Sequence, residues 1–128
     1  MHKPEQVLLV HLRGAVYGID ADQVVQILRV PEITPVPLTD PRLRGICPVE
    51  GSILNIFDGN LLLKGDENRP VDTSEEHSRI LTIRHGGHYY GIIVESVVNT
   101  VNTCDYAYEE SHEEKAVTAV MKQSNEII

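Results

Sequence analysis

The side chains that could do acid–base or metal chemistry in this 128-residue chain include six histidines, two cysteines and 19 acidic residues. His85 and His88 flank Gly86-Gly87 and would face each other across a tight turn, where they could share a metal ion. A zinc or copper site needs further ligands, and none has a fixed spacing to this pair, while the other four histidines are scattered. We interpret His85 and His88 as exposed turn residues and predict no metal site and no cofactor.

Motifs of catalysis are also missing from the sequence. Ser52 follows Gly51 without the G-x-S-x-G frame of a hydrolase, and the glycines form neither G-x-G-x-x-G nor a phosphate loop. Cys47 and Cys104 stand far apart and outside any C-x-x-C motif, which favours buried or half-buried thiols over a disulfide. Asp58, at the end of a predicted strand, is interpreted as a structural cap. The sequence therefore predicts that the chain is not an enzyme.

Charge and hydropathy exclude two further classes of partner. The formal net charge of −8 opposes binding to nucleic acids, whose affinity for proteins comes largely from phosphate neutralisation. No apolar run approaches the roughly 18 residues needed to cross a bilayer, and the N-terminal residues lack the apolar core of a signal peptide. We predict a cytoplasmic protein with no nucleic-acid partner and no direct membrane insertion.

The elements that must position any functional residue are dominated by a hairpin that occurs twice. Residues 79–85 and 88–94 are β-branched and aromatic runs around Gly86-Gly87, a pattern typical of a tight β-hairpin. A shift of 73 positions places Leu81, Ile83, Gly87, Tyr90, Gly91, Ile92, Val97 and Val98 on Leu8, Val10, Gly14, Tyr17, Gly18, Ile19, Val24 and Val25. We interpret Gly18 and Gly91 as structural residues that permit close backbone approach. The sequence therefore predicts two copies of one β unit.

Between and after the hairpins the sequence predicts four further segments. Apolar residues recur at helical spacing over 22–28, which predicts a short helix there. Residues 52–58 and 97–102 are rich in strand-forming side chains and predict strands. Residues 64–78 carry one aliphatic residue among charges and turn formers, and we expect a solvated connection. The resulting expectation is an all-β fold of two small lobes, with a groove at their seam that suits a partner helix.

The end of the chain breaks the repeat. With a one-residue insertion, residues 51–54 align with residues 125–128, yet the first copy continues through Asp58 and the second stops. We therefore expect the last strand to be cut short. A shortened strand leaves unpaired backbone groups on its neighbour, which could pair with a second copy of the chain.

The order and spacing of several segments carry a family resemblance. They are Tyr17-Gly18-Ile19-Asp20, Val24-Val25-Gln26-Ile27, Ile33-Thr34-Pro35-Val36-Pro37, Leu43-Arg44-Gly45-Ile46, Gly51, residues 53–58 and residues 80–101. Over about residues 7–128 the chain resembles the CheW-like domain of bacterial chemotaxis, an adaptor between chemoreceptors and the histidine kinase CheA. The resemblance implies two five-stranded, SH3-like β-barrel subdomains with one or two short helices. It places the first at about 7–63 with a returning strand at 117–128, and the second at about 78–116.

Three departures from the family pattern bear on partner choice. Family members typically have Asn-Leu-Arg-Gly where this chain has Pro48-Val49-Glu50-Gly51, so a charge on the partner surface is reversed. A frequent glutamate of the family corresponds to Gln26, and a Pro-x-x-Asp strand ending becomes Asn55-Ile56-Phe57-Asp58. A reversed charge at an interface is expected to alter partner choice more than fold.

The resemblance implies a non-enzymatic scaffold associated with membrane chemoreceptor arrays. It would bind the receptor's cytoplasmic helical tip in the seam groove and the regulatory domain of a CheA-like kinase through its barrel ends. The residues expected to contact partners are Val24, Gln26, Ile27, Glu50, Gly51, Val97 and Val98. Core packing is the alternative for Val24 and Ile27, and a solvated turn charge is the alternative for Glu50. For the whole chain, the alternatives are a detached module of a larger kinase or receiver-containing coupling protein, and a small-ligand-binding β-barrel.

Overall fold

The computed structural model describes residues 5–37, 40–63, 69–102, 109–110 and 119–122. These residues form strands with two very short helical segments, so the expected all-β class is confirmed. The elements in chain order are β1 (Gln6–Leu12), β2 (Ala15–Asp20), a 3₁₀ turn η1 (Ala21–Gln23), β3 (Val24–Arg29), β4 (Leu43–Val49), β5 (Ser52–Asp58), α1 (Gly59–Leu62), β6 (Arg79–His85), β7 (His88–Val94), β8 (Ser96–Asn102), β9 (Glu109–Glu110) and β10 (Ala119–Lys122). No helix in this described part of the chain has the length and apolarity to cross a membrane.

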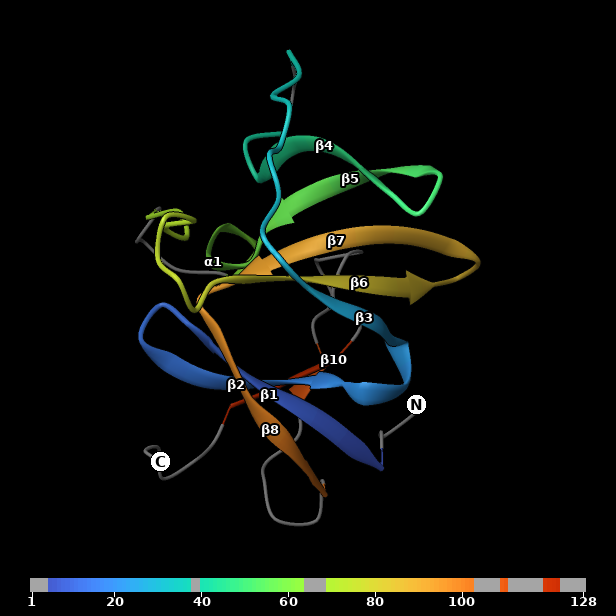
Figure 1. The fold of residues 1–128 in the computed structure, drawn as a ribbon. Coiled ribbons are helices and arrows are strands. Elements are labelled where there is room, and N and C mark those ends of the chain that lie inside the picture. The colour runs from blue at the N-terminus through green and yellow to red at the C-terminus, as the bar shows by residue number, and fades with distance from the viewer. Residues whose placement is uncertain (1–4, 38–39, 64–68, 103–108, 111–118, 123–128) are drawn as a thin grey trace.

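The strands form two five-stranded sheets, as expected. The first sheet has the order β8-β1-β2-β10-β9 and the second has the order β3-β6-β7-β5-β4. In Figure 1 the first sheet occupies the lower half of the view and the second occupies the upper half. An isolated bridge between Thr34 and Ile46, with both backbone hydrogen bonds at 2.9 Å, links the segment after β3 to β4.

The two predicted hairpins are present and share one register. In β1–β2, Leu9 lies opposite Gly18, and 73 positions later Thr82 lies opposite Gly91 in β6–β7. Both tips, Arg13-Gly14 and Gly86-Gly87, have two consecutive positive φ angles, 55° and 74° in the first and 60° and 82° in the second. These are the angles of the tight turns that match strand twist. The duplication read from the sequence is therefore a duplication of structure.

Each copy gives its third strand to the other copy. After the first hairpin β3 crosses to pair with β6, and after the second hairpin β8 crosses to pair with β1 (Figure 1). The expected division of strands between residues 7–63 and 78–116 is therefore wrong. Strands β3, β4 and β5 precede residue 64 but belong to the sheet of the second hairpin, while β10 joins the first sheet by pairing with β2.

The predicted helix over residues 22–28 is also wrong. Between residues 20 and 29 only η1 is helical. The Asp20 carboxylate caps it by accepting a 3.0 Å hydrogen bond from the Asp22 N–H. Residues from Val24 onward alternate between half-buried and exposed along β3, a period of two. Two adjacent valines favour this extended conformation, and β6 supplies the partner that the local pattern does not reveal. The repeat predicts β3 better than the local pattern does, because the equivalent residues 97–102 are predicted to form a strand.

The core consists of three groups of buried side chains. The central group joins the two sheets and comprises Leu8, Val10, Leu12, Ile19, Leu62, Leu81, Ile83, Ile92 and Val94. A second group lies in the second sheet and comprises Cys47, Leu54, Ile56, Val71, Ile80 and Ile93. The third lies in the first sheet and comprises Val7, Leu9 and Val16. Both copies of the hairpin contribute to the central group, so the seam between the sheets is itself a core.

Tyr90 at the edge of the central group provides a test of this packing. Its ring meets Phe57 edge-on, with centroids 6.0 Å apart and an interplanar angle of 88°. Burial raises the pKa of Tyr90 to about 12, because desolvation disfavours the phenolate. An unfolded tyrosine loses its proton near a pKa of about 10. Between these two values the unfolded state therefore binds fewer protons, and the free energy of unfolding falls as the pH rises.

We expect Tyr90→Phe to lose less stability than the wild type between pH values of about 10 and about 12. Urea unfolding across this range measures the difference. Tyr89→Phe, at an exposed tyrosine of the same strand, is the matched control and should follow the wild type. Equal pH dependence in the wild type and Tyr90→Phe would contradict the burial of this phenol.

Candidate partner-binding surface

The residues expected to contact partners lie on three elements rather than on one helical face. Val24, Gln26 and Ile27 lie on β3, Glu50 and Gly51 form the β4–β5 turn, and Val97 and Val98 lie on β8. Because β3 and β8 belong to different sheets, the structure divides these residues between the two lobes. Their exposure and contacts decide which of them can meet a partner.

Gln26 and Glu50 are brought together by the fold. The Gln26 side-chain amide Nε2 donates to Glu50 Oε2 over 3.2 Å at an exposed position. Glu50 has φ of 49° and Gly51 has φ of 84°, so the β4–β5 turn is of the same tight type as the two hairpin tips. The contact joins the turn to β3, 24 residues earlier in the chain, and leaves the negative charge of Glu50 paired with a neutral amide.

Val24, Val97 and Val98 are packing residues. Val24 and Val97 are partly buried against the central group that joins the sheets. Val98 is partly buried against Val7, Leu9 and Val16 in the first sheet. For Val24 the structure thus shows the core packing that the sequence left open, whereas Ile27 is 44% exposed.

Three exposed apolar residues were missed by the sequence reasoning. Val25 is 52% exposed on β3, Ile53 is 70% exposed on β5 and Tyr89 is 51% exposed on β7. Together with Ile27 they are the exposed large hydrophobic residues of the described part of the chain. The sequence does not reveal which apolar residue of a strand will be exposed, because buried strands contain the same residue types. In the 73-residue repeat, Val25 and Tyr89 correspond to Val98 and Val16 of the first sheet.

Asp58 is the N-cap of α1, in agreement with its interpretation as a structural cap, and it is also fully buried. Its carboxylate pairs with Arg44 Nη1 over 2.6 Å. It also accepts backbone hydrogen bonds from Asn60 and Leu61, which begin α1, and from Val71 in the segment before β6. Residues 64–78 were expected to be a solvated connection, and Val71 is instead only 3% exposed in the core of the second sheet. Asp58 therefore anchors that connection.

Gly18 and Gly91 occupy equivalent places in the two hairpins, and both are buried. A Cβ atom at Gly91 would lie 2.6 Å from Ile56 Cδ1 and 3.1 Å from Ile80 Cγ2. These separations are shorter than van der Waals contact, so a side chain at Gly91 would displace core residues. Gly18 lies between Leu9 of β1 and Met121 of β10.

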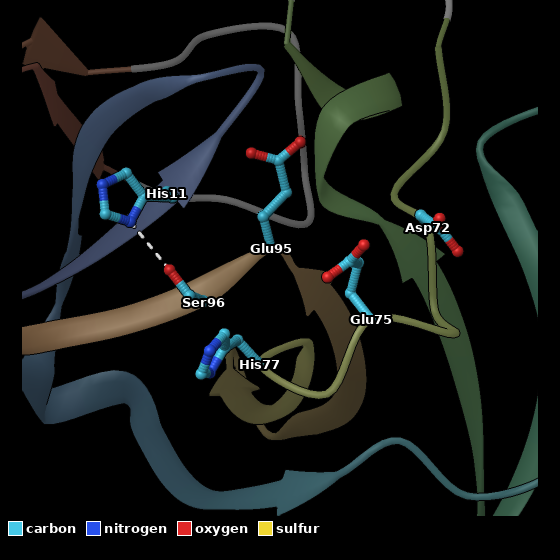
Figure 2. Close-up of a pocket in the computed structure, with 6 residues that line it drawn as sticks. All are labelled: His11, Asp72, Glu75, His77, Glu95 and Ser96. Carbon is cyan, nitrogen blue, oxygen red and sulfur yellow. Dashed lines mark hydrogen bonds between the residues drawn. The ribbon is translucent and has the colours of Figure 1, made fainter.

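A shallow polar pocket of about 280 Å³ lies beside β1 and β8 (Figure 2). It is lined by His11, Asp72, Glu75, His77, Glu95 and Ser96. His11 Nδ1 is 2.7 Å from Ser96 Oγ, and the Glu95 carboxylate accepts hydrogen bonds from the Gly14 backbone and the Asn60 amide. The hydroxyl and backbone of Ser74 hold the pKa of Asp72 below its usual value. The His11–Ser96 contact places a base beside a hydroxyl, but the Glu95 carboxylate is hydrogen-bonded to Gly14 and Asn60 rather than to His11. Among the described residues this pair therefore lacks the third group that orients a catalytic histidine.

The structure offers no metal centre within the residues it describes. None of their histidine, cysteine, aspartate and glutamate side chains form a group of three or more that could hold a metal ion. His85 and His88 do lie opposite each other across the second hairpin, and His85 Nδ1 lies 3.1 Å from Gln23 Nε2. Cys47 is fully buried, and this burial raises the pKa of its thiol. Cys104 lies outside the described residues.

Comparisons with known proteins place this fold in a family. The family model described as "CheW-like domain" matches residues 6–128. The scaffolding protein TtCheW from Thermoanaerobacter tengcongensis has a similar crystal structure, with a TM-score of 0.70 and 22% sequence identity over 91% of this chain and 77% of that chain. No curated protein matches the sequence significantly.

Proposed function

Because the chain belongs to the CheW-like family, which is a family of non-enzymatic scaffolds, we propose that it is a coupling adaptor of a chemotaxis-type array. In this proposal it binds the helical tip of a chemoreceptor and the regulatory domain of a CheA-like kinase, and it lies in the cytoplasm at the receptor array. The observation that carries the proposal is the family match over residues 6–128, which takes in both sheets.

The surface of the molecule supports a role in protein contacts. Ile27 on β3 is exposed, and by register it shares a face with Leu81, a member of the central group between the sheets. An exposed aliphatic side chain at the margin of a seam suits an apolar stripe on a helix. The Gln26–Glu50 contact adds a polar rim beside it, as is usual for protein interfaces.

Binding to purified partners tests the adaptor proposal. The protein is titrated with a receptor cytoplasmic hairpin and with the regulatory domain of a CheA-like kinase, both from the same genome as this chain. We expect measurable binding to at least one of them, and absence of binding to either at about 100 µM would contradict the proposal. Ile27→Ala should weaken the receptor complex, while the exposed loop variant Glu76→Gln should leave it unchanged.

The charge of Glu50 should affect which kinase domains this adaptor binds. We expect Glu50→Arg to strengthen binding about tenfold to a kinase domain from an array whose own adaptor has arginine at this turn. Arginine tolerates the positive φ of residue 50 no worse than glutamate does, so the fold should be kept. Isothermal titration calorimetry of the wild type and of Glu50→Arg measures the two affinities. Glu76→Arg changes the net charge by the same amount and is the control. An unchanged affinity would mean that the β4–β5 turn lies outside the interface.

A further inference from the structure

The two copies of the repeat differ at one place inside their sheets. The first sheet is closed there, because Leu9 is 1% and Val16 is 7% exposed and Val98 packs against them. In the second sheet two of the three equivalent side chains are about half exposed. By the shift of 73 positions, the equivalent residues are Leu9, Val16 and Val98 in the first sheet and Thr82, Tyr89 and Val25 in the second. Val98 and Val25 are each the extra residue at a β-bulge, where the register of their strand shifts. A filled core in one copy thus corresponds to an open apolar surface in the other.

Thr82 is buried beneath this surface without a hydrogen bond. The residue is 5% exposed, and its Oγ1 is fully buried with no partner among the described residues. Thr82 lies opposite Gly91 on β7 and opposite Gln26 on β3. Tyr89, two residues before Gly91, is therefore the diagonal neighbour of Thr82 on the same face of the sheet. A buried unpaired hydroxyl lowers stability relative to an apolar group of the same shape. Thr82 is therefore a polar group in a place where the first copy has leucine.

Charges of opposite sign lie beside this surface, with Glu50 at one margin and Arg84 opposite Tyr89 on the same face. Glu50 reaches it through Gln26, and none of the described basic side chains contacts Glu50. Arg84 lies across the strand pair from Tyr89 and marks the far margin with a positive charge. The basic group of a partner would therefore approach on the Glu50 side, and the net charge of −8 of the whole chain favours such an approach.

We propose that this open end of the second sheet, formed by Val25, Gln26, Glu50, Thr82 and Tyr89, receives an arginine or lysine inserted by the protein partner. The aliphatic stem of that residue packs on Tyr89 and Val25, and its N–H groups donate to the Glu50 carboxylate and the Thr82 hydroxyl. The inference rests on the proposed function, since the partner is one of the two array proteins. It adds the residue class that the partner must supply.

The hydroxyl of Thr82 gives the first test, because it should affect stability and binding in opposite directions. We expect Thr82→Val to raise the urea midpoint of the free protein and to weaken the complex at least about fivefold. Thr82→Ser keeps the hydroxyl, so it should retain the wild-type affinity although it loses a buried methyl group. A Thr82→Val variant that is less stable than the wild type, or that binds equally well, would overturn the proposal.

The carboxylate and the aromatic ring give the second test. Glu50→Gln should weaken the complex at low ionic strength, and the difference should shrink as salt is added. Glu76→Gln, at an exposed loop position, is the charge-matched control and should bind as the wild type does. Tyr89→Ala should weaken binding about tenfold with little loss of stability, since this ring is half exposed.

The probes are the same-genome kinase regulatory domain and receptor hairpin, titrated separately. Absence of wild-type binding to both would overturn the adaptor function and this inference together. Wild-type binding that survives Thr82→Val, Glu50→Gln and Tyr89→Ala would overturn this inference alone. Size-exclusion chromatography with light scattering adds a further outcome, because a wild-type dimer that Tyr89→Ala converts to a monomer would identify a second copy as the occupant and overturn the assignment of a basic partner.

Discussion

Asp58→Ala should lower the free energy of unfolding by about 3 kcal/mol, because a fully buried carboxylate that accepts several hydrogen bonds is removed, while its partner Arg44 still reaches water. The fully buried carboxylate pairs with Arg44 at 2.6 Å, and the substitution also leaves the backbone N–H groups that begin α1 without their acceptor. The Val71 N–H loses the same acceptor, which releases the connection before β6 from the second sheet. Such a loss is a large fraction of the stability of an ordinary domain.

The chain supplies a matched control for this experiment. Asp40 pairs with Arg42 at 2.9 Å, but both side chains are about one third exposed, and this pairing holds the pKa of Asp40 below its usual value. Asp40→Ala should cost no more than about 1 kcal/mol, because water screens an exposed pair. Urea unfolding of both variants compares the two sites. Equal losses would show that Asp58 contributes no more than a surface carboxylate.

Cutting the chain within residues 64–68 should abolish folding of each half and allow the halves to fold together. Fragment 1–66 holds β1 to β5, and fragment 67–128 holds β6 to β10. Each sheet takes strands from both fragments, and the central core takes side chains from both hairpins, so neither half can bury its apolar surface alone. Mixed at equal concentration, the fragments should restore a single cooperative unfolding transition.

Amide NMR spectra and size-exclusion chromatography of the separate and mixed fragments measure this result. The separate fragments should give the narrow amide dispersion of unfolded chains, and the mixture should give the spectrum of the intact protein. Fragment 1–66 mixed with fresh fragment 1–66 is the control for unspecific association. A folded monomer of either fragment would show that half of the chain forms a lobe by itself.

The hairpins were predictable because their signals are local. Gly86-Gly87 between two runs of strand-forming residues predicts a tight turn wherever the chain folds, and the 73-residue repeat carries that prediction to Arg13-Gly14. The error over residues 22–28 was also local. A short apolar run fits a period of two as well as a period of 3.6, and only the pairing of β3 with β6 decides between them.

The exchange of third strands could not be read from the sequence. A strand that follows a hairpin can pair with its own hairpin or with an identical one elsewhere, and the local residues are the same in both cases. The Gln26–Glu50 contact depends on this long-range arrangement, because it joins β3, in the sheet of the second hairpin, to the β4–β5 turn. The residues expected to contact partners stay a prediction, and the element that carries three of them, β3, is a strand rather than the expected helix.

The crossing of β3 and β8 also limits how the molecule can move. In most two-lobed proteins the lobes rotate about a polar seam. Here a rotation would have to pull a strand from each sheet at once and open a core of nine buried side chains. We therefore expect the two sheets to move as one body, so that a displacement of one sheet is passed to the other rather than absorbed at a hinge.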